Sequence, residues 1–153
     1  MATKRVLIVD DNADAAESMA MWIRQIGHEP VTAYDGATAL LAGARLLPDL
    51  IFIDLIMPML SGFELAQTIR QQPWGKKPLL VAITGWAHPD ARSRSIKSGF
   101  DHYFIKPMAL DLVTRLTMQQ LDGAATSNKR DPGVAEPLLH LLLDDEPRLL
   151  EDH

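Results

Sequence analysis

The sequence contains no cysteine, which excludes a disulfide framework, thiol catalysis, and zinc or iron–sulfur sites built on thiolates. It also contains no apolar run near the roughly 20 residues that a membrane-spanning helix needs, and its start does not resemble a secretory signal. Basic residues are not in surplus, because 15 Lys and Arg stand against 20 Asp and Glu, so direct binding to nucleic acid is not expected. We expect a cytoplasmic protein that works away from membranes.

The charge is distributed unevenly along the 153 residues. Residues 1–121 carry 12 acidic and 12 basic side chains, whereas residues 122–153 carry the other 8 acidic and only 3 basic ones. The final segment therefore accounts for the whole net charge of -5. We expect one neutral globular domain over residues 1–122, followed by an acidic linker and C-terminal extension over residues 123–153.

Short apolar runs alternate with segments of helical periodicity along the domain. Most of these runs are continuous, which is typical of strands that are covered on both faces. The predicted strands span residues 6–9, 30–33, 50–53, 79–83 and 102–105. The predicted helices span about residues 13–26, 35–45, 89–98 and 109–121, and a further one, the third, starts near Gly62. Five βα units in a row imply a parallel sheet wrapped by helices, which is the doubly wound α/β class.

Several helix ends are predicted from their capping residues. Asp35 is expected to cap the second helix, and Ser61 with Glu64 has the spacing of a capping box at the start of the third. Pro89 is expected in the first turn of the fourth helix, and Gly99 just after its last turn.

Polar residues follow four of the five predicted strands, at the edge where sheets of this class bind ligands. They are Asp10 and Asp11 after the first strand, Asp54 after the third, Thr84 after the fourth and Lys106 after the fifth. Carboxylates gathered in one cleft repel each other and need a cation. Carboxylate oxygens without His or Cys nearby favour a hard ion, and a site with few protein oxygens suits Mg²⁺ better than Ca²⁺.

These residue types together are complementary to a phosphoryl group. A cleft that holds Mg²⁺, the Lys106 ammonium and the Thr84 hydroxyl can stabilise the negative charge spread over phosphoryl oxygens in the transition state. One of the carboxylates is then the natural nucleophile.

The same residues carry a resemblance to a known family. The runs VLIVDD (6–11), DLIMP followed by SG (54–62), VAITG (81–85) and YFIKP (103–107) resemble, in order and spacing, the receiver domain of two-component response regulators (CheY-like). The resemblance covers about residues 4–121 and implies a flavodoxin-like sheet with strand order 2-1-3-4-5. It also implies a signalling switch rather than a classical enzyme. The TGW run (84–86) is more similar to stand-alone receivers or those of hybrid kinases than to DNA-binding regulators.

The resemblance implies a role for each site residue. Asp54 would accept a phosphoryl group from a phosphohistidine on a sensor histidine kinase or a histidine phosphotransfer protein. Asp10 and Asp11 would hold Mg²⁺ together with Asp54 and the backbone carbonyl of Ile56. Lys106 would pair with the phosphoryl oxygens, and the peptide bond between Lys106 and Pro107 is expected to be cis.

The resemblance also implies a conformational switch. Thr84 would move its hydroxyl onto the phosphate and Tyr103 would turn inward, which would change the surface made by the fourth helix, fifth strand and fifth helix. Two copies would be able to pair through this surface or through the C-terminal extension. Ile56 and Trp86 occupy positions where the family tunes attack by water on the aspartyl phosphate, and their large apolar side chains predict slow self-dephosphorylation.

The sequence leaves alternatives open on two points. Besides the phosphorylated switch, the domain is compatible with an interaction module that never takes phosphate, or with a Mg²⁺-dependent phosphatase-like enzyme. Such an enzyme would need a second acid/base carboxylate two residues after the nucleophile, and Ile56 occupies that position. Residues 138–153 are either an apolar segment that packs on the domain or on another copy, or the start of a truncated second receiver. The second interpretation rests on Asp144 and Asp145, which follow an apolar run as Asp10 and Asp11 do.

Overall fold

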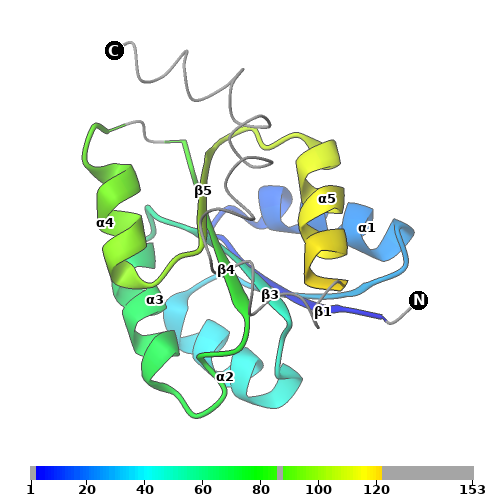
Figure 1. Ribbon diagram of the computed structural model, residues 1–153, viewed down its shortest axis with the longest axis horizontal. Helices are drawn as coiled ribbons and strands as arrows, with labels where there is room; N and C mark the ends of the chain where they lie inside the picture. Colours follow the sequence, from blue (N-terminus) through cyan, green and yellow to red (C-terminus); the bar gives the residue numbers. More distant parts are fainter. Residues whose placement is uncertain (1–2, 86–87, 122–153) are drawn as a thin grey trace.

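A computed structural model describes residues 3–85 and 88–121 of the chain, and five strands alternate with five helices over this part (Figure 1). The strands are β1 (Arg5–Val9), β2 (Glu29–Ala33), β3 (Leu50–Asp54), β4 (Leu79–Thr84) and β5 (His102–Ile105). The helices are α1 (Ala13–Gln25), α2 (Gly36–Leu46), α3 (Gly62–Gln71), α4 (Ala91–Ser98) and α5 (Leu110–Leu121). The predicted order of elements is confirmed.

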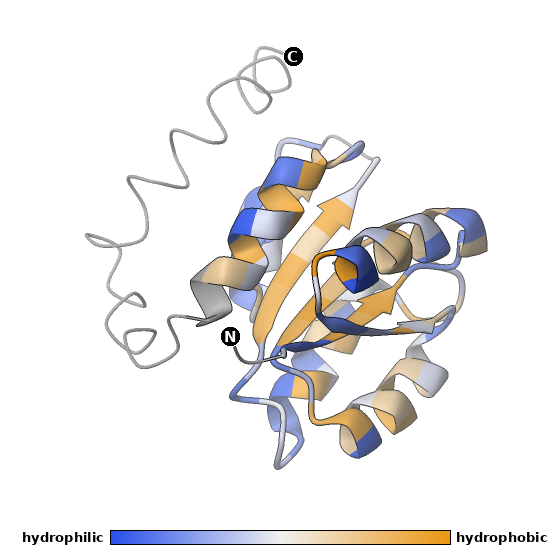
Figure 2. Cartoon of the chain, turned by 90° about the vertical axis from the view of Figure 1, so that its right-hand side faces the viewer, coloured by the Kyte–Doolittle hydropathy of each residue, from blue (hydrophilic) through white to orange (hydrophobic). Residues whose placement is uncertain are grey.

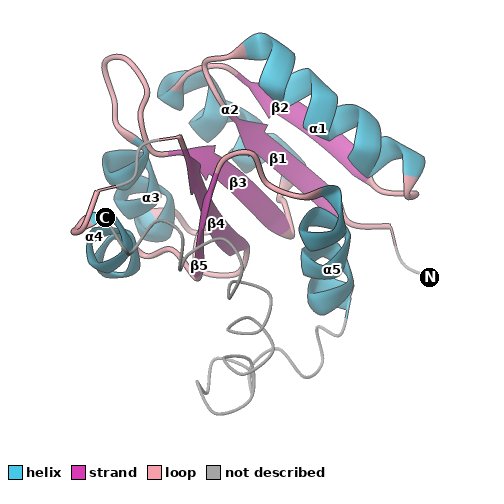
Figure 3. Cartoon of the chain, turned by 90° about the horizontal axis from the view of Figure 1, so that it is seen from above, coloured by secondary structure: helices cyan, strands magenta, loops and turns pink. Residues whose placement is uncertain are grey.

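The strands form one parallel sheet in the order β2-β1-β3-β4-β5, which confirms the predicted class and strand order. Helices α1 and α5 cover one face of the sheet, and α2, α3 and α4 cover the other (Figures 1 and 3). The sheet is therefore the middle of three layers.

The continuous apolar strands supply two separate cores, because successive side chains of a strand point to opposite faces. In β1, Leu7 and Val9 pack toward α2 and α3, while Val6 and Ile8 pack toward α1 and α5. The same alternation holds in β3, and the central strands β3 and β4 are accordingly apolar along most of their length, while the helices carry one polar side (Figure 2). Burial on both sides of the sheet explains why these runs show no alternation in the sequence.

The predicted caps hold α2 and α3 in place. The Asp35 carboxylate accepts a hydrogen bond of 2.7 Å from the Thr38 backbone N–H at the start of α2. At the start of α3, the Ser61 hydroxyl accepts from the Glu64 N–H and the Glu64 carboxylate accepts from the Ser61 N–H, so the capping box is confirmed.

The start of α4 differs from the prediction. Pro89 precedes the helix, which begins at Ala91 with Asp90 as its N-cap. The reason is a turn in which the Ala91 N–H donates to the His88 carbonyl, so that the first helical bond runs from the Arg94 N–H to the Asp90 carbonyl. Gly99 ends the helix with a φ of 111°, as expected for a glycine at this position.

Other predictions meet the limits of the described residues. Among the helices of residues 3–85 and 88–121, none is long and apolar enough to cross a membrane. The predicted linker and C-terminal extension (123–153) lie outside the described residues, as does Trp86.

Candidate functional site

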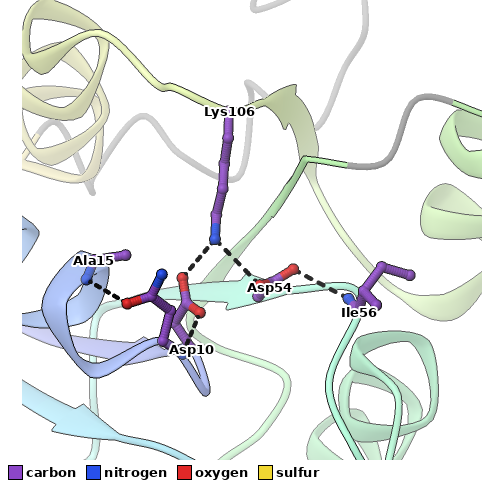
Figure 4. Close-up of polar contacts among 6 residues, drawn as sticks. Asp10, Ala15, Asp54, Ile56 and Lys106 are labelled. Atoms are coloured by element: carbon purple, nitrogen blue, oxygen red, sulfur yellow. Dashed lines mark hydrogen bonds and ion pairs between the residues drawn. The ribbon is translucent and has the colours of Figure 1, made fainter.

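The strand order brings the predicted site residues together at one edge of the sheet. Asp10 directly follows β1 and Asp54 ends β3, and these two strands are neighbours. Lys106 directly follows β5, where its backbone N–H donates to the Thr84 carbonyl over 2.8 Å. Its long side chain then reaches back over the edge of the sheet toward β1 and β3 (Figure 4).

The Lys106 ammonium bridges the two buried carboxylates. Its Nζ lies 2.7 Å from Asp10 Oδ2 and 3.1 Å from Asp54 Oδ2. Asp10 is only 1% exposed and Asp54 7%, so these charge-assisted hydrogen bonds are largely shielded from water. The cation that the clustered acids require is thus partly supplied by the protein itself.

Backbone N–H groups fix the other oxygen of each carboxylate. Asp10 Oδ1 accepts a hydrogen bond of 2.9 Å from the Asn12 N–H, and Asp54 Oδ1 accepts one of 3.0 Å from the Ile56 N–H. Asn12 also caps α1, because its side-chain oxygen accepts from the Ala15 N–H. The loops after β1 and β3 therefore hold both carboxylates in one orientation.

Burial and charge shift the pKa values of this group in defined directions. Burial is the largest influence on Asp54 and raises its pKa, and the Asp10 charge adds to this, while the hydrogen bond from Ile56 and the Lys106 charge oppose it. For Lys106, burial alone would lower the pKa, but the hydrogen bond to Asp10 and the charges of both carboxylates raise it overall. Lys106 is therefore a fixed cation, and a further cation would stabilise the ionised carboxylate of Asp54.

Asp11 completes a set of oxygens suited to such a cation. Asp10, Asp11 and Asp54 each offer a carboxylate oxygen, and these oxygens lie within 4.8 Å of one another. Asp11 is exposed while the other two are buried, so the set opens to solvent on one side. No other group of this kind occurs in the described part of the chain. An all-carboxylate donor set without His or Cys fits a hard divalent ion such as Mg²⁺.

The predicted switch residues lie on the two strands beside this cleft. Thr84 is fully buried at the end of β4, and Tyr103 in β5 is 9% exposed. Burial raises the pKa of the Tyr103 hydroxyl, and the Arg92 guanidinium of α4 lies 5.5 Å from the centre of its ring. Tyr103 is thus placed between the sheet and α4, while Ile56 has an exposed side chain at the cleft.

The sequence predicted one backbone feature of the site and missed the roles of two residues. The peptide bond between Lys106 and Pro107 is cis, as predicted. The roles of Asn12 and Arg92 were missed: the Asn12 backbone N–H fixes Asp10, and Arg92 packs on the ring of Tyr103. Asn12 had a detectable signal, because an Asn just before a helical segment is a preferred N-cap. Arg92 had none, since its contact joins α4 to a strand that only the fold brings near.

Comparison with known proteins defines the class. The chain matches the family model of the response regulator receiver domain over residues 6–124, and it belongs to this family. Receiver domains are switches of two-component signalling rather than classical enzymes.

Individual relatives are moderately similar. The transcriptional regulatory protein PrrA of Mycobacterium tuberculosis is 33% identical over 131 residues, which cover 84% of this chain and 55% of PrrA. A 14.6 kDa protein of Leptolyngbya boryana is 32% identical over 120 residues, or 78% of this chain and 91% of that protein. The structure of the chemotaxis protein CheY4 of Vibrio cholerae superimposes with a TM-score of 0.72 and 25% identity, over 77% of this chain and 98% of CheY4. The chain spans about half the length of curated relatives such as PrrA.

Proposed function

We propose that Asp54 is the phosphoacceptor of a His-to-Asp phosphorelay. The observation that supports this best is the pairing of a 7% exposed carboxylate at a strand end with an ammonium 3.1 Å away, beside two further carboxylates. One oxygen of Asp54 attacks the phosphorus of a phosphohistidine on a sensor histidine kinase or a phosphotransfer protein. A P–O bond forms, the P–N bond breaks, and the imidazole leaves with its electron pair.

Asp10, Asp11, Asp54 and the backbone carbonyl of Ile56 would hold Mg²⁺. The ion supplies neutralisation of the charge that develops on the phosphoryl oxygens. Lys106 supplies a second positive charge, and it would exchange its contact with Asp54 for one with the incoming phosphoryl oxygens. Asp10 keeps its own hydrogen bond to Lys106 and so retains the ammonium at the cleft.

The readout of phosphorylation is a change on the surface of α4, β5 and α5. The Thr84 hydroxyl moves onto the new phosphate, and Tyr103 takes up the space that this movement leaves. Because Arg92 packs on the Tyr103 ring, a movement of the tyrosine is passed directly to α4. A downstream partner, or a second copy of the chain, reads that surface.

The proposal is tested by intact mass after incubation with a small phosphodonor and Mg²⁺. The wild-type chain is expected to gain about 80 Da by covalent phosphoryl attachment, and Asp54→Asn is expected to gain nothing. Asp14→Asn is the matched control, because Asp14 lies in the first turn of α1, and it should gain the same mass as the wild type. A wild-type chain that gains no mass supports the non-phosphorylated interaction module instead. Equal labelling of Asp54→Asn would show that another residue is the acceptor, and hydrolysis of added phosphate esters by Asp54 would indicate the phosphatase-like enzyme.

Ile56 and Trp86 are proposed to shield the aspartyl phosphate from water. The Ile56 side chain is 51% exposed two residues after Asp54, and Trp86 follows Thr84 by two residues. Ile56→Asn combined with Trp86→Ala is expected to shorten the lifetime of the phosphorylated state roughly tenfold, which corresponds to about 1.4 kcal/mol of barrier. The measurement is the decay of the phosphorylated mass after removal of the phosphodonor.

Met59→Ala is the control for this variant. Met59 lies in the same loop as Ile56 with a fully exposed side chain, so its truncation should leave the lifetime unchanged. A double variant with the wild-type lifetime would remove the shielding role.

A further inference from the structure

Helix α4 presents the most one-sided charge of the described helices. Between Ala91 and Ser98 it carries Arg92, Arg94 and Lys97 and no acid. Ala91, Ser95 and Ser98 are buried, while Ser93, Arg94, Ile96 and Lys97 are exposed and Arg92 is half-buried. Ile96 is 63% exposed on the same side of the helix. The α4 face, defined by Arg92, Ser93, Arg94, Ile96 and Lys97, therefore combines positive charge with an exposed apolar side chain.

Helix α4 contains no acid of its own that could balance these cations. Its N-cap Asp90 makes no side-chain capping bond, and two of its three cations lie in the N-terminal half, where the helix dipole disfavours them. Arg94 and Arg92 rest on the rings of Phe63 and Tyr103, which fixes the two guanidinium groups at the borders of the face. An anionic group placed on α4 would thus meet the exposed cations Arg94 and Lys97.

The complementary chemistry is present in the same chain. Residues 138–153 (LLHLLLDDEPRLLEDH) contain seven leucines, five acids and a single arginine. We propose that this segment, named here the acidic leucine segment, docks on the α4 face of its own chain, with its acids against the cations and its leucines around Ile96. The docked segment would compete with any partner that reads α4, whether or not Asp54 is phosphorylated.

The connecting residues are long enough for docking within one chain. Residues 122–137, between the end of α5 and the acidic leucine segment, include seven Gly, Ala or Pro residues. A coil of 16 residues spans about 22 Å on average and roughly 50 Å when extended. Only the edge strand β5 separates α5 from α4 (Figure 1). Helix α1 lies beside α5, with the Trp22 Nε1–H donating to the Thr114 hydroxyl, so a segment without preference would meet α1 at least as readily.

The absence of natural cysteine allows a direct test by disulfide cross-linking in the full chain. Ser93→Cys places a thiol on the α4 face, and His140→Cys places one in the acidic leucine segment, without removing any charge from either. The control pair joins His140→Cys to Gln25→Cys, an exposed position near the end of α1. The Ser93 pair is expected to close within one chain at least about fivefold faster than the control pair, read by intact mass and non-reducing electrophoresis.

The electrostatic part of the proposal has its own readout. Raising the salt to about 0.5 M, or changing Asp144 and Asp145 to Asn and Glu146 to Gln, is expected to bring the Ser93 pair down to the control rate, because both weaken charge attraction. Equal rates for the two pairs would overturn the proposal, and so would disulfides that form between chains, which would assign the face to a second copy. If the Ser93 pair closed fast and neither high salt nor neutralisation of the acids slowed it, the charge complementarity on which the choice of α4 rests would be overturned.

Discussion

Lys106→Met is expected to slow phosphoryl transfer to Asp54 by about two to three orders of magnitude, because it removes a positioned charge from the reacting centre. It is also expected to destabilise the fold by about 3 kcal/mol, since breaking a buried ion pair leaves uncompensated charge. The side chain of Lys106 is 27% exposed, but those of Asp10 and Asp54 are 2% and 10% exposed, so the stranded charges are the carboxylates. The rate is measured by mass against time of incubation, and the stability by urea unfolding in EDTA.

Three controls separate the roles of this lysine. Lys97→Met makes the same chemical change on the exposed face of α4. It should leave the rate of phosphoryl transfer unchanged and should change the free energy of unfolding by less than about 0.5 kcal/mol. Adding Asp10→Asn to Lys106→Met should recover much of the lost stability, because it removes the most deeply buried of the unpaired charges, but should not recover the rate. Mg²⁺ should stabilise Lys106→Met more than the wild type, because it would restore a cation to the cleft. Wild-type transfer by Lys106→Met would contradict the role given to the ammonium.

The fold was predictable because its dominant signal is local in the sequence. The runs 6–9, 50–53 and 79–83 are apolar at every position, and short continuous apolar runs are typical of strands covered on both faces. The caps Asp35 and Ser61 were equally visible, since each bonds to a residue three positions away. Pro89 misled the prediction because the residues before α4 form a turn through His88, and a proline suits either position.

The site was predictable only as a set of residues. Parallel strands align their carboxyl ends, so Asp10, Asp54 and Lys106 could be assigned to one edge of the sheet without coordinates. The sequence did not reveal that Lys106 contacts both carboxylates, or that Arg92 packs on Tyr103. Lys106 lies 96 residues from Asp10 and 52 residues from Asp54 in the sequence. The contact between Arg92 and Tyr103 depends on the position of α4 against β5.

Arg70 in α3 is the clearest residue that the sequence did not single out. Its guanidinium donates to the backbone carbonyls of Gly99, Gly75 and Pro78, each over 2.9 Å. It also pairs with Asp101 over 2.9 Å, and the same Asp101 oxygen accepts from the Leu80 N–H. The end of α3, the end of α4 and the starts of β4 and β5 are thus joined by one side chain.

Arg70→Met is expected to destabilise the domain by about 3 kcal/mol, because three carbonyls lose their donor and the partly buried Asp101 loses its ion pair with Arg70. The side chains of Arg70 and Asp101 are only 18% and 13% exposed, so water cannot readily replace the lost bonds. The measurement is the midpoint of urea unfolding, which should fall while the dependence of the unfolding free energy on urea stays constant. In a thermal experiment, the melting temperature should fall by about 10 °C.

The controls for Arg70 distinguish a structural role from a functional one. Arg24→Met, on the exposed last turn of α1, should change stability by less than about 0.5 kcal/mol. Asp101→Asn should cost less than Arg70→Met, because the amide oxygen can still accept from Leu80 and the arginine keeps its three carbonyls. The Arg70 contacts lie at the amino ends of the strands and the carboxylates at the carboxyl ends, so folded Arg70→Met should still take up the phosphoryl group at the wild-type rate. A variant that kept its stability but lost phosphorylation would mean that Arg70 acts through the site rather than through the joint between α3, α4 and the sheet.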